Sequence, residues 1–195
     1  MVLSHGDDDN GVPVADYMKE GVMKTVKQRG GWLLVFFFGL ILAAVVVERF
    51  EDMLKKEVEL SYFVPLLIGH GGNTGSQSVA TVIRAIALGH VGPRNLVFVL
   101  RKELAAGFIM GSGLGMVIFA LSLWWDGFSP QVGMTVAISL PIVSLWANML
   151  GGLFPLVAVY FGYNPAVTSA PLMTTVVDSS GLIIYFLIAK WVLKL

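Results

Sequence analysis

The chain contains no cysteine among its 195 residues, and only 13% of them are charged. Without cysteine, disulfides, thiolate metal sites and cysteine nucleophiles are excluded. Acidic and basic residues are equal in number, 13 of each, so no net field favours nucleic acid, and no zinc-ligand spacing or basic–aromatic motif does so either. The sequence also lacks an HExxH, a Ser–His or a paired catalytic Asp arrangement, so we do not expect an enzyme.

Hydrophobic residues make up 56% of the chain, whereas charged residues are about half as frequent as the roughly 25% of a soluble domain. A transmembrane helix needs about 20 mostly apolar residues. Five segments of this kind predict an all-α membrane protein with five transmembrane helices. They are residues 31–47, about 60–88, 104–125, 134–161 and 166–193. We therefore expect a short cytoplasmic leader over residues 1–30 and one transmembrane domain over residues 31–195.

The distribution of lysine and arginine sets the orientation of the helices. A cytoplasmic N-terminus places more of these residues on the cytoplasmic side than outside, which predicts a multi-pass protein of the plasma (inner) membrane. Within the leader, residues 14–28 fit both an amphipathic helix that leads into the membrane and a solvated segment.

Asp178 is a lone carboxylate in the long apolar run of residues 166–195. An ionised Asp in hydrocarbon costs roughly 2.5–3.5 kcal/mol on insertion scales, so it normally faces a partner, a cavity or an ion path. Helical spacing predicts that it shares a polar stripe with other residues. The stripe comprises Thr174, Asp178, Gly181 and Tyr185, flanked by Thr175. The stripe indicates a cation site, and the alternative is an Asp that bonds a neighbouring helix.

A second polar feature interrupts the second apolar segment. Residues 71–78 read GGNTGSQS, and their glycines allow the backbone to bend or to approach a neighbour closely. A helix through this run would carry one polar side, made of His70, Asn73, Gln77, Thr81 and Arg84. The alternative is small-residue helix packing, which we expect instead for Gly111 and Gly115.

Three further polar residues are assigned structural roles. A lone histidine is more often a hydrogen-bonded helper than a metal ligand, and we expect this of His70. For Arg84 we expect snorkelling to the headgroups. Asn148 in the fourth segment is interpreted as a packing residue rather than a pore residue.

The oxygen ligands of these two polar features suit hard cations such as Mg²⁺, Ca²⁺ or Mn²⁺. Mg²⁺ dehydrates reluctantly, so a site with few carboxylates could hold the hydrated ion through its waters. One Asp per chain is little for a divalent cation, but a two-fold dimer presents two. This favours a homodimer with the pore on or near its axis.

The run PLLIGHGGNTGSQS at residues 65–78 resembles the second transmembrane helix of the MgtE family of magnesium transporters. The run PLMTTVVDSSGLIIY at residues 171–185 resembles the fifth helix of that family. The resemblance implies a homodimer of five-helix domains in a lipid membrane, with helices two and five of both subunits lining the pore. It also implies that Asp178 binds a hydrated Mg²⁺, with Asn73, Gln77, Thr174, Thr175 and the backbone of Gly71 and Gly72 along the path. Mn²⁺ and Co²⁺ are further candidate ions.

Two departures from the family pattern bear on these expectations. Many bacterial relatives carry a large cytoplasmic Mg²⁺ sensor before the membrane domain, where this sequence has about thirty residues; a naturally minimal member and an excised domain both fit. Ala170 precedes Pro171 where some relatives have Asn, so one expected ligand is missing. A Mg²⁺ channel, a Na⁺/Mg²⁺ exchanger and a membrane scaffold subunit without transport activity stay open as functions.

Overall fold

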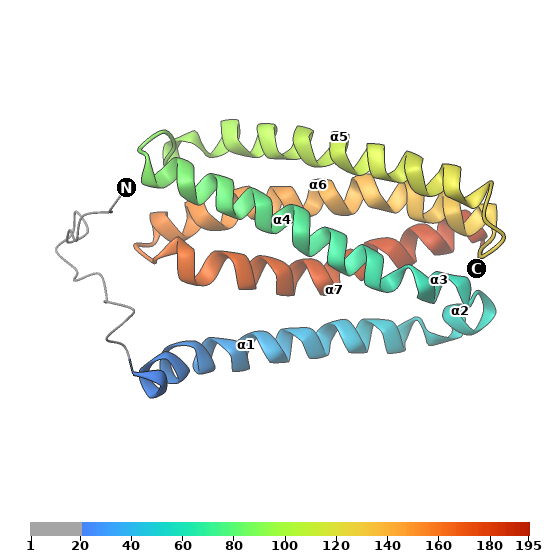
Figure 1. Cartoon of the computed structure of the whole chain (residues 1–195), viewed down its shortest axis with the longest axis horizontal. Coiled ribbons are helices and arrows are strands. Elements are labelled where there is room, and N and C mark those ends of the chain that lie inside the picture. Colours follow the sequence, from blue (N-terminus) through green and yellow to red (C-terminus); the bar gives the residue numbers. More distant parts are fainter. Residues whose placement is uncertain (1–20) are drawn as a thin grey trace. The chain divides into compact units, whose positions relative to one another are not determined.

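The computed structural model describes residues 21–195, and its regular elements are helices (Figure 1). The elements are α1 (Val22–Arg49), α2 (Glu51–Lys56), α3 (Glu59–Tyr62), α4 (Val64–Ala87), the 3₁₀ turn η2 (Pro93–Asn95), α5 (Leu96–Ser122), α6 (Pro130–Tyr160) and α7 (Pro165–Leu193). The expected all-α class is confirmed. Most of the leader expected over residues 1–30, including half of the amphipathic segment over residues 14–28, lies outside the described residues.

The chain divides into two compact parts, Met1–Phe37 and Phe38–Leu195. In the first part the described residues form the beginning of α1. The second part holds the end of α1 and every later helix. The candidate site lies in the second part.

Helix α6 is the centre of the second part. Its most extensive pairing is with α5, followed by α7 and then α4, and α4 also packs against α7 (Figure 1). Helix α6 is hydrophobic around its whole circumference, as is typical of a helix surrounded by other helices. Fully buried side chains such as Val132, Leu140 and Ala147 follow its length.

The contact between α5 and α6 depends on small residues. A Cβ atom added to Gly111 would lie 2.6 Å from the Pro141 Cα atom, and one added to Gly115 would lie 2.5 Å from the Ala137 carbonyl oxygen. The two helix backbones therefore approach closely only because these positions carry no side chain. The expectation that Gly111 and Gly115 serve helix packing is confirmed.

Three helical stretches within residues 21–195 are long and apolar enough to cross a membrane: Pro93–Ser122, Pro130–Tyr160 and Ser169–Leu193. They correspond to the third, fourth and fifth expected segments. Helix α4 has 24 residues, which at about 1.5 Å per residue is long enough to span the hydrocarbon. Its polar residues make it less apolar than these three stretches, so it is not one of them. The expected count of five transmembrane helices stays a prediction.

The second expected segment, residues 60–88, is organised differently from the sequence-based expectation. It begins with the separate short helix α3, and α4 then runs without interruption through the polar stretch 71–78. The glycines of this stretch do not break the helix. Instead they admit neighbours: a Cβ on Gly71 would lie 2.7 Å from Val177 Cγ1, and one on Gly75 would overlap Met173.

Candidate functional site

Helix α4 carries polar residues on two neighbouring faces. Thr74 and Ser78 are buried against the bundle, whereas Asn73 and Gln77 are exposed at the surface of the chain. Thr81 and Arg84 continue the exposed polar face toward the end of the helix. The predicted polar side therefore forms with one exception, because His70 is only half-exposed and turns inward.

The buried face of α4 is hydrogen-bonded to α6. His70 Nε2 lies 2.6 Å from Ser144 Oγ, and Thr74 Oγ1 lies 2.9 Å from the side-chain amide of Asn148. Ser78 Oγ donates to the Asn148 carbonyl oxygen at 3.2 Å. These bonds satisfy polar groups that would be costly in an apolar interior. They confirm His70 as a hydrogen-bonded helper and Asn148 as an interior packing residue of the chain.

Asn148 also connects α4 to α5. In the amide orientation that satisfies both of its polar atoms, its side-chain oxygen accepts from the Gly107 N–H at 3.1 Å and its nitrogen donates to the Thr74 carbonyl oxygen at 3.0 Å. Asn148 is 1% exposed. One amide therefore fixes the polar stretch of α4 to two other helices.

Helix α7 lies beside α4 at the level of the glycine run. A Cβ on Gly72 would contact the Thr174 methyl group at 3.8 Å, and Thr174 Oγ1 donates to the Pro171 carbonyl oxygen at 3.0 Å. Asp178 follows Thr174 by one turn and is half-buried. No hydrogen bond or ion pair joins its carboxylate to the described residues, and its oxygens are not among the buried unsatisfied atoms. The carboxylate therefore stays accessible for a ligand.

The predicted stripe on α7 is only partly accessible. Gly181 and Tyr185 are buried, and the Tyr185 hydroxyl donates to the Leu60 carbonyl oxygen at 3.0 Å. Thr175 is half-buried with its methyl group against Gly39. The structure thus brings Thr174 next to Gly72 and places Thr175 toward α1, while Gly71 faces Val177 and Val143.

A bond from α6 fixes α7 close to Asp178. Trp146 Nε1 donates to Ser180 Oγ at 2.8 Å, and Ser180 in turn donates to the Val176 carbonyl oxygen at 2.5 Å. Sequence reasoning did not single out Trp146, Ser144 or Ser180. The spacing of Ser144 and Asn148 by four residues in an otherwise apolar helix was the available signal.

No group of three or more His, Cys, Asp or Glu side chains that could hold a metal ion occurs within residues 21–195. The oxygen donors near Asp178 on α7 and near Asn73 on α4 are hydroxyls, amides and backbone carbonyls. A single chain therefore offers a site of low charge, which fits a cation that keeps its own water shell better than a fully dehydrated one.

This arrangement defines a helical membrane domain with a polar, accessible feature on each of two neighbouring helices. Residues 64–188 match the sequence model of the MgtE family, described as divalent cation transporter. The chain belongs to this family.

Curated relatives support this assignment. The chain is 32% identical over 183 residues to the magnesium transporter MgtE of Thermus thermophilus, a match that covers 94% of this chain and 40% of the relative. It is 33% identical over 158 residues to the protein of the same name from Bacillus subtilis, covering 81% and 35% respectively. The Enterococcus faecalis protein of that name is 28% identical over 184 residues. The chain spans about two fifths of the length of these relatives.

Proposed function

We propose that this chain moves Mg²⁺ across a membrane, with a hydrated ion held at Asp178. The observation that carries the proposal is the state of this side chain: a carboxylate in an apolar helix that has no hydrogen-bond partner in the described chain and is still accessible. Such a group in a membrane helix is expected to face an ion path or a partner. The Mg²⁺ named for the relatives is the cation that suits a hydrated, low-charge site.

The neighbouring helix α4 supports the same assignment. The contact between Gly72 and Thr174 places α4 and α7 side by side, and Asn73 follows Gly72 on the exposed face. Asn73 and Gln77 would therefore bind the ion's waters on one side while Thr174 and Asp178 do so on the other. Gly72 belongs to the same proposed site through its backbone, whereas Gly71 packs against Val177 and Val143 and Thr175 is directed toward α1, so these two expected ligands are not placed beside the ion.

The exposed polar face of α4 also supports a homodimer. Exposed Asn73 and Gln77 side chains would be costly against lipid, so they require water or protein in front of them. A second copy of the chain across a two-fold axis would supply both, and would bring a second Asp178 to the pore. The orientation with a cytoplasmic N-terminus, the plasma membrane, and transport of Mn²⁺ or Co²⁺ belong to this proposal.

Mg²⁺ uptake into proteoliposomes tests it. The wild type should carry flux, and both Asp178→Ala and Asp178→Asn should abolish it, because neither substitute bears a charge. Glu51→Gln is the matched control, since it removes an exposed carboxylate that pairs with Lys55 outside α7. It should leave flux unchanged.

The outcomes separate the remaining functions. Flux that persists in both Asp178 variants would contradict the assigned ion site. Absence of flux in a folded, dimeric wild type would favour a scaffold subunit, for which the change Asp178→Asn should preserve assembly because the amide still forms hydrogen bonds. Flux that depends on an opposing Na⁺ gradient would identify an exchanger instead of a channel.

A further inference from the structure

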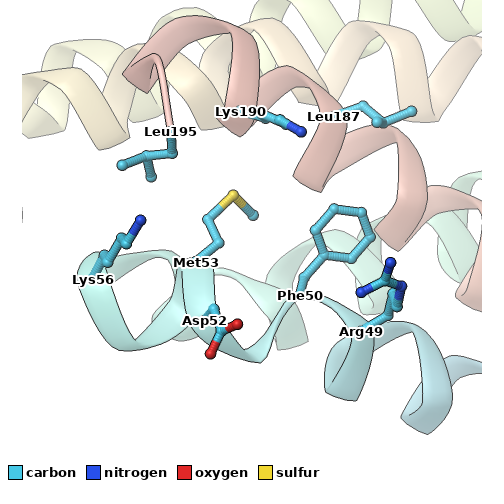
Figure 2. A pocket seen from close by; sticks show the side chains of 8 residues that line it. All are labelled: Arg49, Phe50, Asp52, Met53, Lys56, Leu187, Lys190 and Leu195. Carbon is cyan, nitrogen blue, oxygen red and sulfur yellow. The ribbon is translucent and has the colours of Figure 1, made fainter.

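A pocket of about 400 Å³ lies between α2 and the end of α7, and none of the proposed ion ligands lines it. Figure 2 shows its lining from close by. The lining residues are Arg49, Phe50, Asp52, Met53, Lys56, Leu187, Lys190 and Leu195. All belong to the second compact part of the chain.

The charged side chains that line the pocket are mostly cationic. Arg49, Lys56 and Lys190 line it together with one acid, Asp52, whose carboxylate points away from α7 in Figure 2. No ion pair joins any of the three cations to a carboxylate of the described chain; Lys55, next to Lys56, is instead paired with Glu51 at 2.8 Å. Three like charges around one pocket repel one another, so an anion between them would be stabilised.

The floor of the pocket is apolar. The Phe50 ring packs on Phe186 with centroids 4.8 Å apart, and Met53 is buried beside it. From the pocket, exposed Leu187 and, one turn earlier, exposed Ile183 continue along the outside of α7. A small soluble anion would use the cations alone, whereas a ligand that also carries a hydrocarbon chain would use this apolar track.

The pocket lies where a membrane–water boundary is expected. It includes Leu187 and Lys190, in the last two turns of the apolar stretch Ser169–Leu193. Trp191, which follows Lys190 in the sequence, is exposed, and the α5–α6 connection with exposed Trp124 and Trp125 lies at the same end of the bundle (Figure 1). Tryptophan is enriched at the level of the lipid headgroups.

We propose that this pocket binds the phosphate headgroup of an anionic phospholipid, with an acyl chain along Leu187 and Ile183. Basic side chains close to a bilayer surface attract anionic headgroups through charge. With the proposed cytoplasmic N-terminus, α1 crosses the membrane once, so this pocket faces lipids of the outer leaflet. The Arg49 guanidinium can donate two parallel hydrogen bonds to one phosphate, and Lys56 and Lys190 supply further positive charge. The site does not depend on Asp178 or on Mg²⁺ transport.

Native mass spectrometry of the purified chain tests the proposal, with phosphatidylglycerol and the zwitterionic phosphatidylcholine as probes. The wild type should retain phosphatidylglycerol at concentrations at which phosphatidylcholine is lost. The triple variant Arg49→Gln, Lys56→Gln, Lys190→Gln should weaken phosphatidylglycerol binding about tenfold or more, because each cation near a lipid surface contributes to binding.

The matched control is Arg94→Gln, Arg101→Gln, Lys102→Gln. It removes the same charge from three exposed side chains near the start of α5, at the other end of the bundle (Figure 1). This control should bind phosphatidylglycerol as the wild type does. Circular dichroism checks that both triple variants are folded, and the single change Lys190→Gln, at an exposed position, should still weaken binding if the triple variant does not fold.

Four results would overturn the proposal. They are equal retention of both lipids by the wild type, unchanged binding in the folded pocket variant, equal loss in the pocket and control variants, and efficient competition by soluble glycerol 3-phosphate. The last result would assign the pocket to a soluble phosphate instead of a lipid. Competition by this molecule should fail, since it lacks the acyl chain that the apolar track would bind.

Discussion

Thr74 of α4 and Asn148 of α6 are joined by a buried contact of 2.9 Å between the threonine hydroxyl and the asparagine amide. Asn73, the residue before Thr74, lies on the neighbouring face of α4 and is exposed. Consecutive residues of α4 thus have different roles: Thr74 holds the bundle together, and Asn73 is proposed to meet the ion. Substitutions at neighbouring positions should therefore have different effects.

Asn148→Ala should destabilise the chain. It removes the buried side chain that bonds both Thr74 and the Gly107 N–H. We expect a loss of about 1–2 kcal/mol in the free energy of unfolding, measured by denaturation in detergent micelles. Unchanged stability would mean that water or another side chain takes over these bonds.

Asn73→Ala, the same change on the exposed face of α4, should give the opposite pattern. No hydrogen bond within the described chain depends on the Asn73 side chain, so the stability of the protomer should change by less than about 0.5 kcal/mol. Mg²⁺ flux should fall severalfold, because an amide that orients the ion's waters is lost. Normal flux combined with lower stability would contradict the assignment of the two faces.

Gly111→Ala should weaken the pairing of α5 and α6, because the new methyl group would meet the Pro141 backbone at 2.6 Å and backbone cannot rotate away. We expect a cost of about 1–3 kcal/mol. Gly113→Ala is the control: nothing lies within 4 Å of its Cβ position, and alanine is the better helix former by about 1 kcal/mol. In thermal unfolding, Gly113→Ala should match or exceed the wild type, and a similar loss in both variants would contradict the packing argument.

Tyr185→Phe should loosen the connection between α7 and α3. The change removes the 3.0 Å bond from the tyrosine hydroxyl to the Leu60 carbonyl oxygen while keeping the ring in place. The expected loss is about 0.5–1.5 kcal/mol of unfolding free energy. Tyr62→Phe removes a hydroxyl from an exposed ring and should be neutral in the same assay.

The sequence indicates the two polar features well. An acid in an apolar run and a glycine-rich polar run are both rare in membrane helices, so Asp178 and residues 71–78 stand out without a structure. The outcome at α4 was harder to predict. Helical periodicity correctly places Asn73, Gln77 and Thr81 on one exposed side, but it does not reveal how the glycine run meets the other helices. The sequence left open whether these glycines bend the backbone or admit a close neighbour, and in the structure residues of α6 and α7 pack closely against Gly71 and Gly75.

Tyr185 illustrates a second limit of sequence reasoning. Helical spacing correctly aligns Tyr185 with Asp178, but the direction in which the stripe points depends on what α7 packs against. Leu60, 125 residues earlier in the chain, provides the acceptor for the tyrosine hydroxyl. Contacts of such sequence separation leave no local pattern.

Helix α4 has a consequence for how the protein is made. It does not reach the apolarity of α5, α6 and α7, and its buried hydroxyls bond to residues of α6. During synthesis α4 emerges from the ribosome before that partner exists. We therefore expect α4 to be stably inserted in the bilayer only after α6 has been synthesised. The order in which the helices assemble would then differ from the order in which they are translated.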